Sequence, residues 1–105
     1  MRTRARIRLE HLSGPDDGKI VAFAGPTIVL GRYPTQDLVL AHDPTVSGRH
    51  ARLTCQGDTL YIEDLGSKQG TFVSGRRIEA RVELAPGAVF RIGHSWFAAP
   101  EQEPR

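Results

Sequence analysis

Short apolar segments separated by turn residues run along almost the whole chain, and this pattern most constrains its fold. In residues 4–12, charged side chains alternate with Ile7, Leu9 and His11, which is the period of a strand with one buried face. Comparable segments occupy residues 19–23, 27–32, 50–56, 59–65, 81–84, 88–93 and 94–99. Gly, Pro or Asp residues separate them, and no stretch has the period of an amphipathic helix. The pattern predicts an all-β domain built as an antiparallel sandwich of short strands.

The size and composition of the chain fit one globular domain. Its 105 residues can bury a single core, and a content of 39% hydrophobic and 25% charged residues is typical of a folded protein. The formal net charge of +2 favours an anionic partner only weakly. No apolar run approaches the roughly 20 residues of a membrane-spanning helix, so we expect no membrane partner.

Cys55 is the single cysteine of the sequence. One thiol forms no intramolecular disulfide and no thiolate metal cluster, so we expect a half-buried side chain and a cytoplasmic setting. The four histidines lack the spacing of metal ligands and are scattered along the chain as His11, His42, His50 and His94. We therefore expect no metal site and no cofactor.

Three loops combine glycine with polar or cationic side chains: residues 31–37 (GRYPTQD), 43–50 (DPTVSGRH) and 66–76 (GSKQGTFVSGR). Glycine lets the backbone approach a ligand closely, while Ser, Arg, Lys and Gln side chains supply hydrogen-bond donors. The candidate donors in these loops are Arg32, Ser47, Arg49, Lys68 and Gln69. Carboxylates occur only at the margins of the loops. This set of residues favours an oxyanion ligand over a general acid and base pair.

Other interpretations of these residues stay open at this point. Ser47 and His50 are close enough in sequence to suggest a hydrolase, but the chain has no G-x-S-x-G motif and no acid evidently placed to orient the histidine. Arginines at positions 2, 4, 6 and 8 form a stripe of period two, which suits a nucleic-acid contact or, by default, the solvated face of a strand. The aromatic residues of the second half are expected in the core rather than on a stacking surface: Phe72, Phe90, Trp96 and Phe97.

Four blocks of the sequence, in order, resemble the forkhead-associated (FHA) domain, a family of phosphothreonine-recognition modules. They are GR at 31–32, SGRH at 47–50, DLGSKQGT at 64–71 and SG at 74–75. The resemblance covers about residues 6–98 and implies a twisted FHA/SMAD-like β-sandwich of about eleven short strands, whose loops at one end bind a phosphothreonine peptide. We expect the FHA domain at residues 1–99 and a flexible polar tail at 100–105.

The resemblance also implies a role for individual loop residues. Arg32 matches the arginine that clamps the phosphate, because a guanidinium can form paired charge-assisted hydrogen bonds. Ser47 matches a serine whose hydroxyl donates to a phosphate oxygen, and Lys68 occupies a position that often contacts phosphate. Structural roles in the loops are implied for Gly31, Gly48, His50, Gly70 and Gly75.

This sequence departs from the family pattern at three positions. Gln69 stands where the family usually has an asparagine that holds the peptide backbone, and it keeps the same donor and acceptor on a longer side chain. Ser74 replaces a second asparagine that stabilises a turn. Gly48 stands where a second arginine is common, and we expect Arg49, the next residue, to supply a cation in its place.

The sequence therefore predicts a binding module, not an enzyme, that recruits a threonine-phosphorylated protein in signalling. The phosphothreonine lies on a separate partner or on another segment of the module's own full-length chain. A phosphate carries about −1.5 to −2 charges near neutral pH, enough to distinguish it from an unmodified threonine. The domain is expected to be monomeric, with no nucleic-acid partner. The alternative is an FHA-like sandwich that acts as a phosphate-independent interaction scaffold.

Overall fold

The computed structural model describes residues 5–100, which form eleven β-strands and no helix. The strands are β1 (Ile7–His11), β2 (Ile20–Phe23), β3 (Thr27–Gly31), β4 (Leu38–Val39), β5 (Ala51–Gln56), β6 (Thr59–Asp64), β7 (Thr71–Val73), β8 (Arg76–Arg77), β9 (Val82–Leu84), β10 (Val89–Ile92) and β11 (Ser95–Ala98). The prediction of an all-β fold with about eleven short strands is confirmed. Within the described part of the chain, no helix is long and apolar enough to cross a membrane.

Some sequence-based predictions fall on the ends of the chain. The tail expected at residues 100–105 lies outside the described residues apart from Pro100, and so do Arg2 and Arg4 of the arginine stripe. Within that stripe, Arg6 is exposed and Arg8 is half-buried in β1. The domain bounds of 1–99 stay a prediction.

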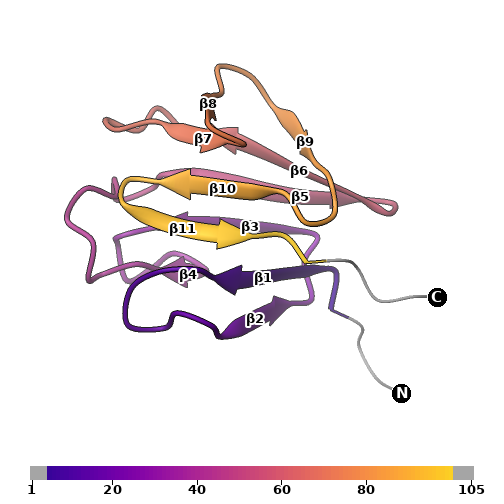
Figure 1. The fold of residues 1–105 in the computed structure, drawn as a ribbon, viewed down its shortest axis with the longest axis horizontal. Coiled ribbons are helices and arrows are strands. Elements are labelled where there is room, and N and C mark those ends of the chain that lie inside the picture. Colours follow the sequence, from indigo (N-terminus) through magenta and orange to yellow (C-terminus); the bar gives the residue numbers. More distant parts are fainter. Residues whose placement is uncertain (1–4, 101–105) are drawn as a thin grey trace.

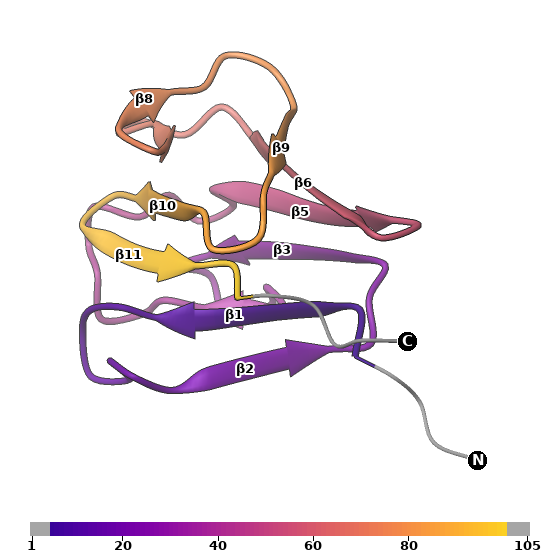
Figure 2. The ribbon, with the colours of Figure 1, turned by 45° about the vertical axis from the view of Figure 1, so that its right-hand side comes forward.

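The strands form two sheets that face each other across one core (Figures 1 and 2). The first sheet has six strands in the order β2-β1-β11-β10-β7-β8, and the second has five in the order β4-β3-β5-β6-β9. The strand pairs of both sheets are antiparallel except for β3 and β4, which run parallel. The antiparallel sandwich expected from the sequence is therefore found with one exception, the parallel pairing of the two-residue edge strand β4.

The core follows from the alternation in the strands. In β1, Ile7, Leu9 and His11 are buried while the residues between them are half-buried on the outer face. Apolar side chains from both sheets and from the loops complete the core, among them Ile28, Leu30, Leu40, Val46, Leu53, Ile62, Phe90, Ile92 and Phe97. Each fully buried side chain of this size contributes roughly 1.5–3 kcal/mol of transfer free energy. This rigid core fixes the strand ends from which the loops emerge.

Strand β7 and the first residue of β8 lie in the segment 66–76 that the sequence pattern assigned to a loop, and β4 lies in a segment that it did not assign to a strand. They have only two or three residues each, too few for an alternation to be recognised. Their pairing comes from the neighbouring strands: β4 extends along β3, while β7 joins β10 and carries β8 as a hairpin.

Two aromatic residues expected in the core lie on the outer face of the six-stranded sheet instead. Trp96 is 43% exposed and Phe72 is half-buried, whereas Phe90 and Phe97 are buried and stacked with ring centroids 5.2 Å apart. The guanidinium of Arg91 lies over Phe72 at 4.1 Å and near Trp96 at 5.6 Å from the ring centroids. The cation thus covers part of the apolar surface that the two rings would otherwise expose.

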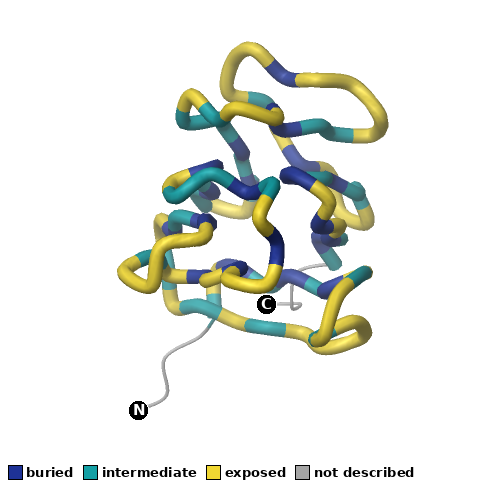
Figure 3. Tube along the Cα trace, turned by 90° about the vertical axis from the view of Figure 1, so that its left-hand side faces the viewer, coloured by how far each residue is buried: buried dark blue, intermediate teal, exposed yellow. Residues whose placement is uncertain are grey.

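The loops of interest gather at one end of the sandwich. The connections between β3 and β4, β4 and β5, β6 and β7, and β10 and β11 lie on the left in Figure 1, while β1 begins and β11 ends on the right. Viewed from the loop end, most of the connecting backbone is exposed, with short buried stretches between (Figure 3). Segments far apart in the sequence therefore meet on one accessible surface.

Candidate functional site

The end of β3 and the β4–β5 loop are joined by their backbones. The amide of Arg32 donates to the carbonyl of Ser47 at 3.0 Å, and the amide of Tyr33 donates to the carbonyl of Gly48 at 3.2 Å. The crossing is so close that a Cβ on Gly31 would lie 2.0 Å from the Gly48 carbonyl oxygen. Gly31 is therefore required for this close approach, which brings Arg32 next to the SGRH segment.

Arg32 is anchored at one atom and exposed at the rest of its head group. Its Nε donates to the carbonyl oxygen of Val46 at 3.1 Å, so the guanidinium is held against the β4–β5 loop. No described residue accepts a hydrogen bond from either Nη group. The remaining donors of the planar head group are left for a ligand, in the geometry that suits a bidentate oxyanion contact.

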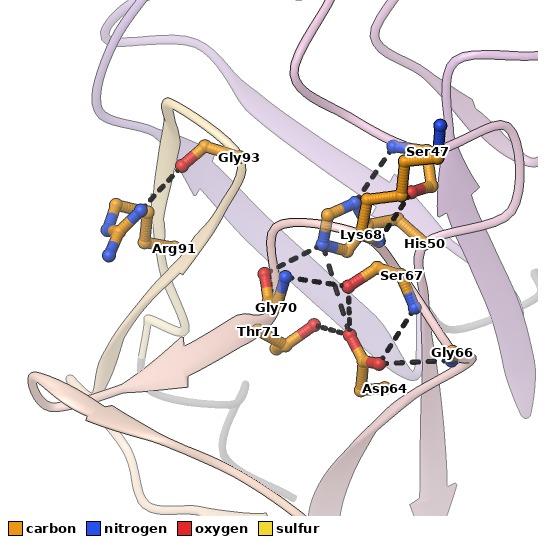
Figure 4. A network of polar contacts seen from close by, with 10 residues as sticks. All are labelled: Ser47, His50, Asp64, Gly66, Ser67, Lys68, Gly70, Thr71, Arg91 and Gly93. Atoms are coloured by element: carbon orange, nitrogen blue, oxygen red, sulfur yellow. Dashed lines mark hydrogen bonds and ion pairs between the residues drawn. The ribbon is translucent and has the colours of Figure 1, made fainter.

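His50 connects two of the loops through both ring nitrogens (Figure 4). The amide of Ser47 donates to Nδ1 at 3.0 Å, so the proton of the neutral ring is on Nε2, which donates to the carbonyl of Gly70 at 2.8 Å. The imidazole is completely buried, and this burial lowers its pKa, so it stays neutral although Asp64 is 3.9 Å away. His50 thus fixes the β4–β5 loop against the β6–β7 loop.

The Ser47 hydroxyl contacts the β6–β7 loop. Its oxygen accepts a hydrogen bond from the amide of Lys68 at 3.1 Å, which leaves the hydroxyl proton free to be donated (Figure 4). Because the backbone of Ser47 and not its hydroxyl contacts His50, the histidine cannot take the serine proton as it would in a hydrolase. The side chains of Lys68 and Gln69 are exposed beside this contact.

Asp64 organises the β6–β7 loop and is not among the site residues predicted from the sequence. Its carboxylate accepts hydrogen bonds from four groups: the amides of Gly66 and Ser67 at 3.0 and 2.9 Å, and the hydroxyls of Ser67 and Thr71 at 2.6 Å each (Figure 4). Burial alone would raise the pKa of Asp64, but these hydrogen bonds outweigh it and lower the pKa. An aspartate that ends a strand before Gly-Ser is a turn signal that could have indicated this role.

Asp43 is a second internal acceptor, and it ties the β4–β5 loop to the β10–β11 turn. It accepts from the amide of Thr45 at 2.9 Å, the amide of His94 at 3.0 Å and the hydroxyl of Ser95 at 2.6 Å, and also from the Thr45 hydroxyl. Burial raises the pKa of Asp43, but the hydrogen bonds prevail and lower it to about 2. The carboxylate is therefore ionised and fully used inside the protein, four residues before Ser47.

Of the other residues predicted for the site, Arg49 and Gly70 lie in the loops that His50 joins, and Gly75 does not. Arg49 is exposed between Gly48 and His50, and no described residue pairs with its side chain. Gly70 accepts from His50 and donates its amide to the Ser67 hydroxyl at 2.9 Å. Gly75 lies apart in the β7–β8 turn, where it has φ of +84°.

The β7–β8 turn has an unusual residue at its first central position. Ser74 has φ of +51° and Gly75 follows with φ of +84°, between the paired residues Val73 and Arg76. Two consecutive positive φ values define a type I′ hairpin turn, in which Asn-Gly is the favoured pair. Ser74 therefore occupies a backbone conformation that asparagine would adopt more readily.

The cationic side chains of the three loops are not paired with an acid among the described residues. Within residues 5–100, no carboxylate forms an ion pair with Arg32, Arg49 or Lys68, while Asp43 and Asp64 are occupied by internal hydrogen bonds. No group of three or more His, Cys, Asp or Glu residues in this range could hold a metal ion. The surface is suited to bind an oxyanion through charge-assisted hydrogen bonds.

Comparison with known proteins agrees with this arrangement. A family model described as the FHA domain matches residues 28–93, which contain all three loops. The chain belongs to the FHA domain family. Over 76 residues it is 37% identical to the FHA domain-containing protein FhaB of Mycolicibacterium smegmatis, an alignment that covers 72% of this chain and 48% of FhaB. The chain thus spans about half the length of that relative.

Solved FHA structures have the same fold. The FHA domain of the CT664 protein from Chlamydia trachomatis is 31% identical, with a TM-score of 0.84 and coverage of 92% of this chain and 98% of that one. EmbR of Mycobacterium tuberculosis, whose structure was solved in complex with a low-affinity phosphopeptide, is 26% identical with a TM-score of 0.83. That match covers 94% of this FHA domain and 25% of EmbR.

Proposed function

We propose that this FHA domain recognises phosphothreonine peptides and thereby recruits a threonine-phosphorylated protein in signalling. The observation that carries the proposal is the set of unpaired donors Arg32, Ser47 and Lys68, which come from three loops held together by hydrogen bonds. The phosphopeptide complex of EmbR supports the proposal, because that protein shares the fold at 26% identity.

Each residue contributes a different kind of contact to a bound phosphate. The free Nη groups of Arg32 would bind two phosphoryl oxygens, and the Ser47 hydroxyl would donate to one of them. Lys68 would add a point charge from the β6–β7 loop. Gln69 would hydrogen-bond to the peptide backbone, and Arg49 would add a cation at the rim of the site.

The proposal describes a binding module without catalysis, acting in the cytoplasm. His50 is buried and both of its ring nitrogens are engaged, so it is not available as a general base. The partner carries its phosphothreonine in trans or on another segment of the same full-length chain. The donor surface favours this function over a phosphate-independent scaffold, since such a scaffold needs no convergent unpaired cations.

Binding of matched peptides tests the proposal. An oriented phosphothreonine peptide library would supply a binding sequence, which is then titrated by calorimetry in its phosphorylated and unmodified forms. We expect binding of the phosphorylated form only. Arg32→Ala should weaken it at least tenfold, because a charge-assisted hydrogen bond contributes roughly 1.5–3 kcal/mol and about 1.4 kcal/mol is tenfold in affinity.

The matched control is Arg81→Ala, which removes the same side chain from a place outside the three loops, where Arg81 lies over the ring of Tyr61 at 4.0 Å. It should leave phosphopeptide affinity unchanged. Equal binding of the phosphorylated and unmodified peptides would show that the domain is a phosphate-independent scaffold. Parental affinity in a folded Arg32→Ala variant would show that the phosphate binds elsewhere.

A further inference from the structure

The space beside Gly48 is filled by the side chain of Tyr33. A Cβ built on Gly48 would lie 2.2 Å from Cζ, 2.3 Å from Cε2 and 2.5 Å from Cε1 of the Tyr33 ring. The φ angle of Gly48 is outside the left-handed region, so its backbone conformation does not demand glycine. Instead, the Tyr33 ring fills the space that a side chain on residue 48 would occupy, so such a side chain would have to displace the ring. A glycine-rich loop predicts backbone that is open to a ligand, whereas at Gly48 an aromatic side chain lies over it.

The backbone of Tyr33 is anchored beside Gly48, while its ring is more than half exposed. Tyr33 is 54% exposed, yet its backbone amide donates to the Gly48 carbonyl at 3.2 Å, so the residue is joined to Gly48 by its main chain as well as by its ring. The atoms nearest to Gly48 are those at the hydroxyl end of the ring. No described residue forms a hydrogen bond with the Tyr33 hydroxyl, which is therefore a further unsatisfied donor at the loop end.

The location of this hydroxyl makes it part of the phosphate surface. Tyr33 follows Arg32 directly in the sequence, and the hydroxyl end of its ring lies over Gly48, the residue that follows Ser47, so the phenol lies next to the segment that carries the Ser47 hydroxyl. A side chain on residue 48 would leave the backbone at the same point. A phenol hydroxyl that donates to a phosphoryl oxygen forms a short charge-assisted hydrogen bond, and the ring loses little conformational entropy because it has two χ angles.

We propose that Tyr33 is a phosphopeptide-contacting residue, whose hydroxyl donates a hydrogen bond to the phosphate from the position that a side chain on residue 48 would otherwise occupy. This inference rests on the proposed function and adds a specificity-determining residue to it. It also predicts an energetic coupling between residues 33 and 48: a side chain on residue 48 displaces the phenol, and the loss of the phenol makes room for a side chain on residue 48.

Titration with the phosphothreonine peptide tests the contact directly. Tyr33→Phe keeps the ring on Gly48 and removes only the donor, so it should lower the affinity about five- to tenfold while the unfolding midpoint stays unchanged. Gly48→Ala should cause a similar loss by displacing the ring. Gly48→Arg should lower the affinity in the parent but raise it in a Tyr33→Ala background, where the guanidinium has space to reach the phosphate.

A spectroscopic measurement separates contact from an indirect effect. The chain has two tyrosines, so selective labelling of tyrosine rings gives two sets of NMR signals that the Tyr33→Phe spectrum assigns. The Tyr33 signals should shift on addition of the phosphopeptide, while those of Tyr61, which packs under Arg81, should not. Parental affinity in Tyr33→Phe and unshifted Tyr33 signals, together with loss of binding in Arg32→Ala, would overturn this inference and leave the proposed function intact. If the parent binds no phosphopeptide, both the proposed function and the role of Tyr33 are wrong.

Discussion

Replacing Asp43 by asparagine is expected to lower the free energy of unfolding by about 2 kcal/mol at pH 7. The Asp43 side chain is 5% exposed and accepts four hydrogen bonds, which lower its pKa from about 3.8 to about 2 against the opposing effect of burial. At about 1.4 kcal/mol for each pH unit, that difference corresponds to about 2 kcal/mol of stabilisation of the ionised folded form. The asparagine side chain carries no charge, and its NH₂ group would face two of the donors that now bind a carboxylate oxygen, so this stabilisation is lost.

The sign of the pH dependence follows from the lowered pKa. A carboxylate whose pKa is lower in the folded state stabilises the protein above about pH 3.8, and this contribution disappears as the pH falls toward 2. The difference in unfolding free energy between the parent and Asp43→Asn should therefore be full between pH 5 and 7. It should shrink to a few tenths of a kcal/mol near pH 2, where Asp43 of the folded parent is about half protonated and the unfolded chain is almost fully protonated.

Urea unfolding of three proteins at pH 7, 4 and 2.5 measures this difference. The control is Asp17→Asn, because Asp17 is exposed and its side chain accepts no hydrogen bond within the described residues. The control should differ from the parent by less than about 0.5 kcal/mol at pH 7. The role of the ionised carboxylate would be refuted if Asp43→Asn loses no more unfolding free energy than the control does. It would also be refuted if that loss stays constant down to pH 2.5.

Three further changes probe the loops. Ser74→Asn should raise the free energy of unfolding by about 0.5–1 kcal/mol in urea unfolding, because asparagine adopts a positive φ more readily, and no gain would contradict the strained turn. Gly31→Ala should lower it by more than about 2 kcal/mol, because the new Cβ meets the backbone oxygen of Gly48, and a folded variant of parental Tm would disprove the close crossing. Burial lowers the pKa of His50, so the unfolded chain takes up a proton that the folded protein resists, and stability should fall as the pH drops below about 6.5. The fall should be smaller in His50→Gln. An equal loss of unfolding free energy per pH unit in the parent and in His50→Gln would exclude His50 as the cause.

The fold could be predicted from the sequence because seven of its strands have four to six residues, long enough to show their period. In β1, the alternation identified Ile7, Leu9 and His11 as the buried face, and the structure confirms it. The strands β4, β7 and β8 could not be identified in this way, since two or three residues carry no period. Trp96 was placed on the wrong face because an aromatic residue in an apolar strand indicates burial, whereas here Arg91 covers the outer face.

The residues of the candidate site could likewise be predicted only in part. Exposed donors such as Arg32 and Lys68 could be selected from the sequence because their side chains have few other uses in glycine-rich loops. Asp43 and Asp64 could not, because an aspartate in a turn has many possible hydrogen-bond partners and only the folded loops select among them. The contact between Tyr33 and Gly48 joins residues fifteen positions apart, and no local pattern indicates it.

The position of β1 and β11 determines how a phosphothreonine on the same chain could reach the loops. The first residue of β1 and the last of β11 lie at the end of the sandwich opposite the loops, and the longest dimension of the molecule is 39 Å. A connecting segment that runs along this length needs about 12 residues even when fully extended, at roughly 3.3 Å per residue. A phosphothreonine only a few residues from either strand cannot reach the loops of its own molecule and must bind a second one. Linker length therefore selects between self-recognition and recruitment of another molecule.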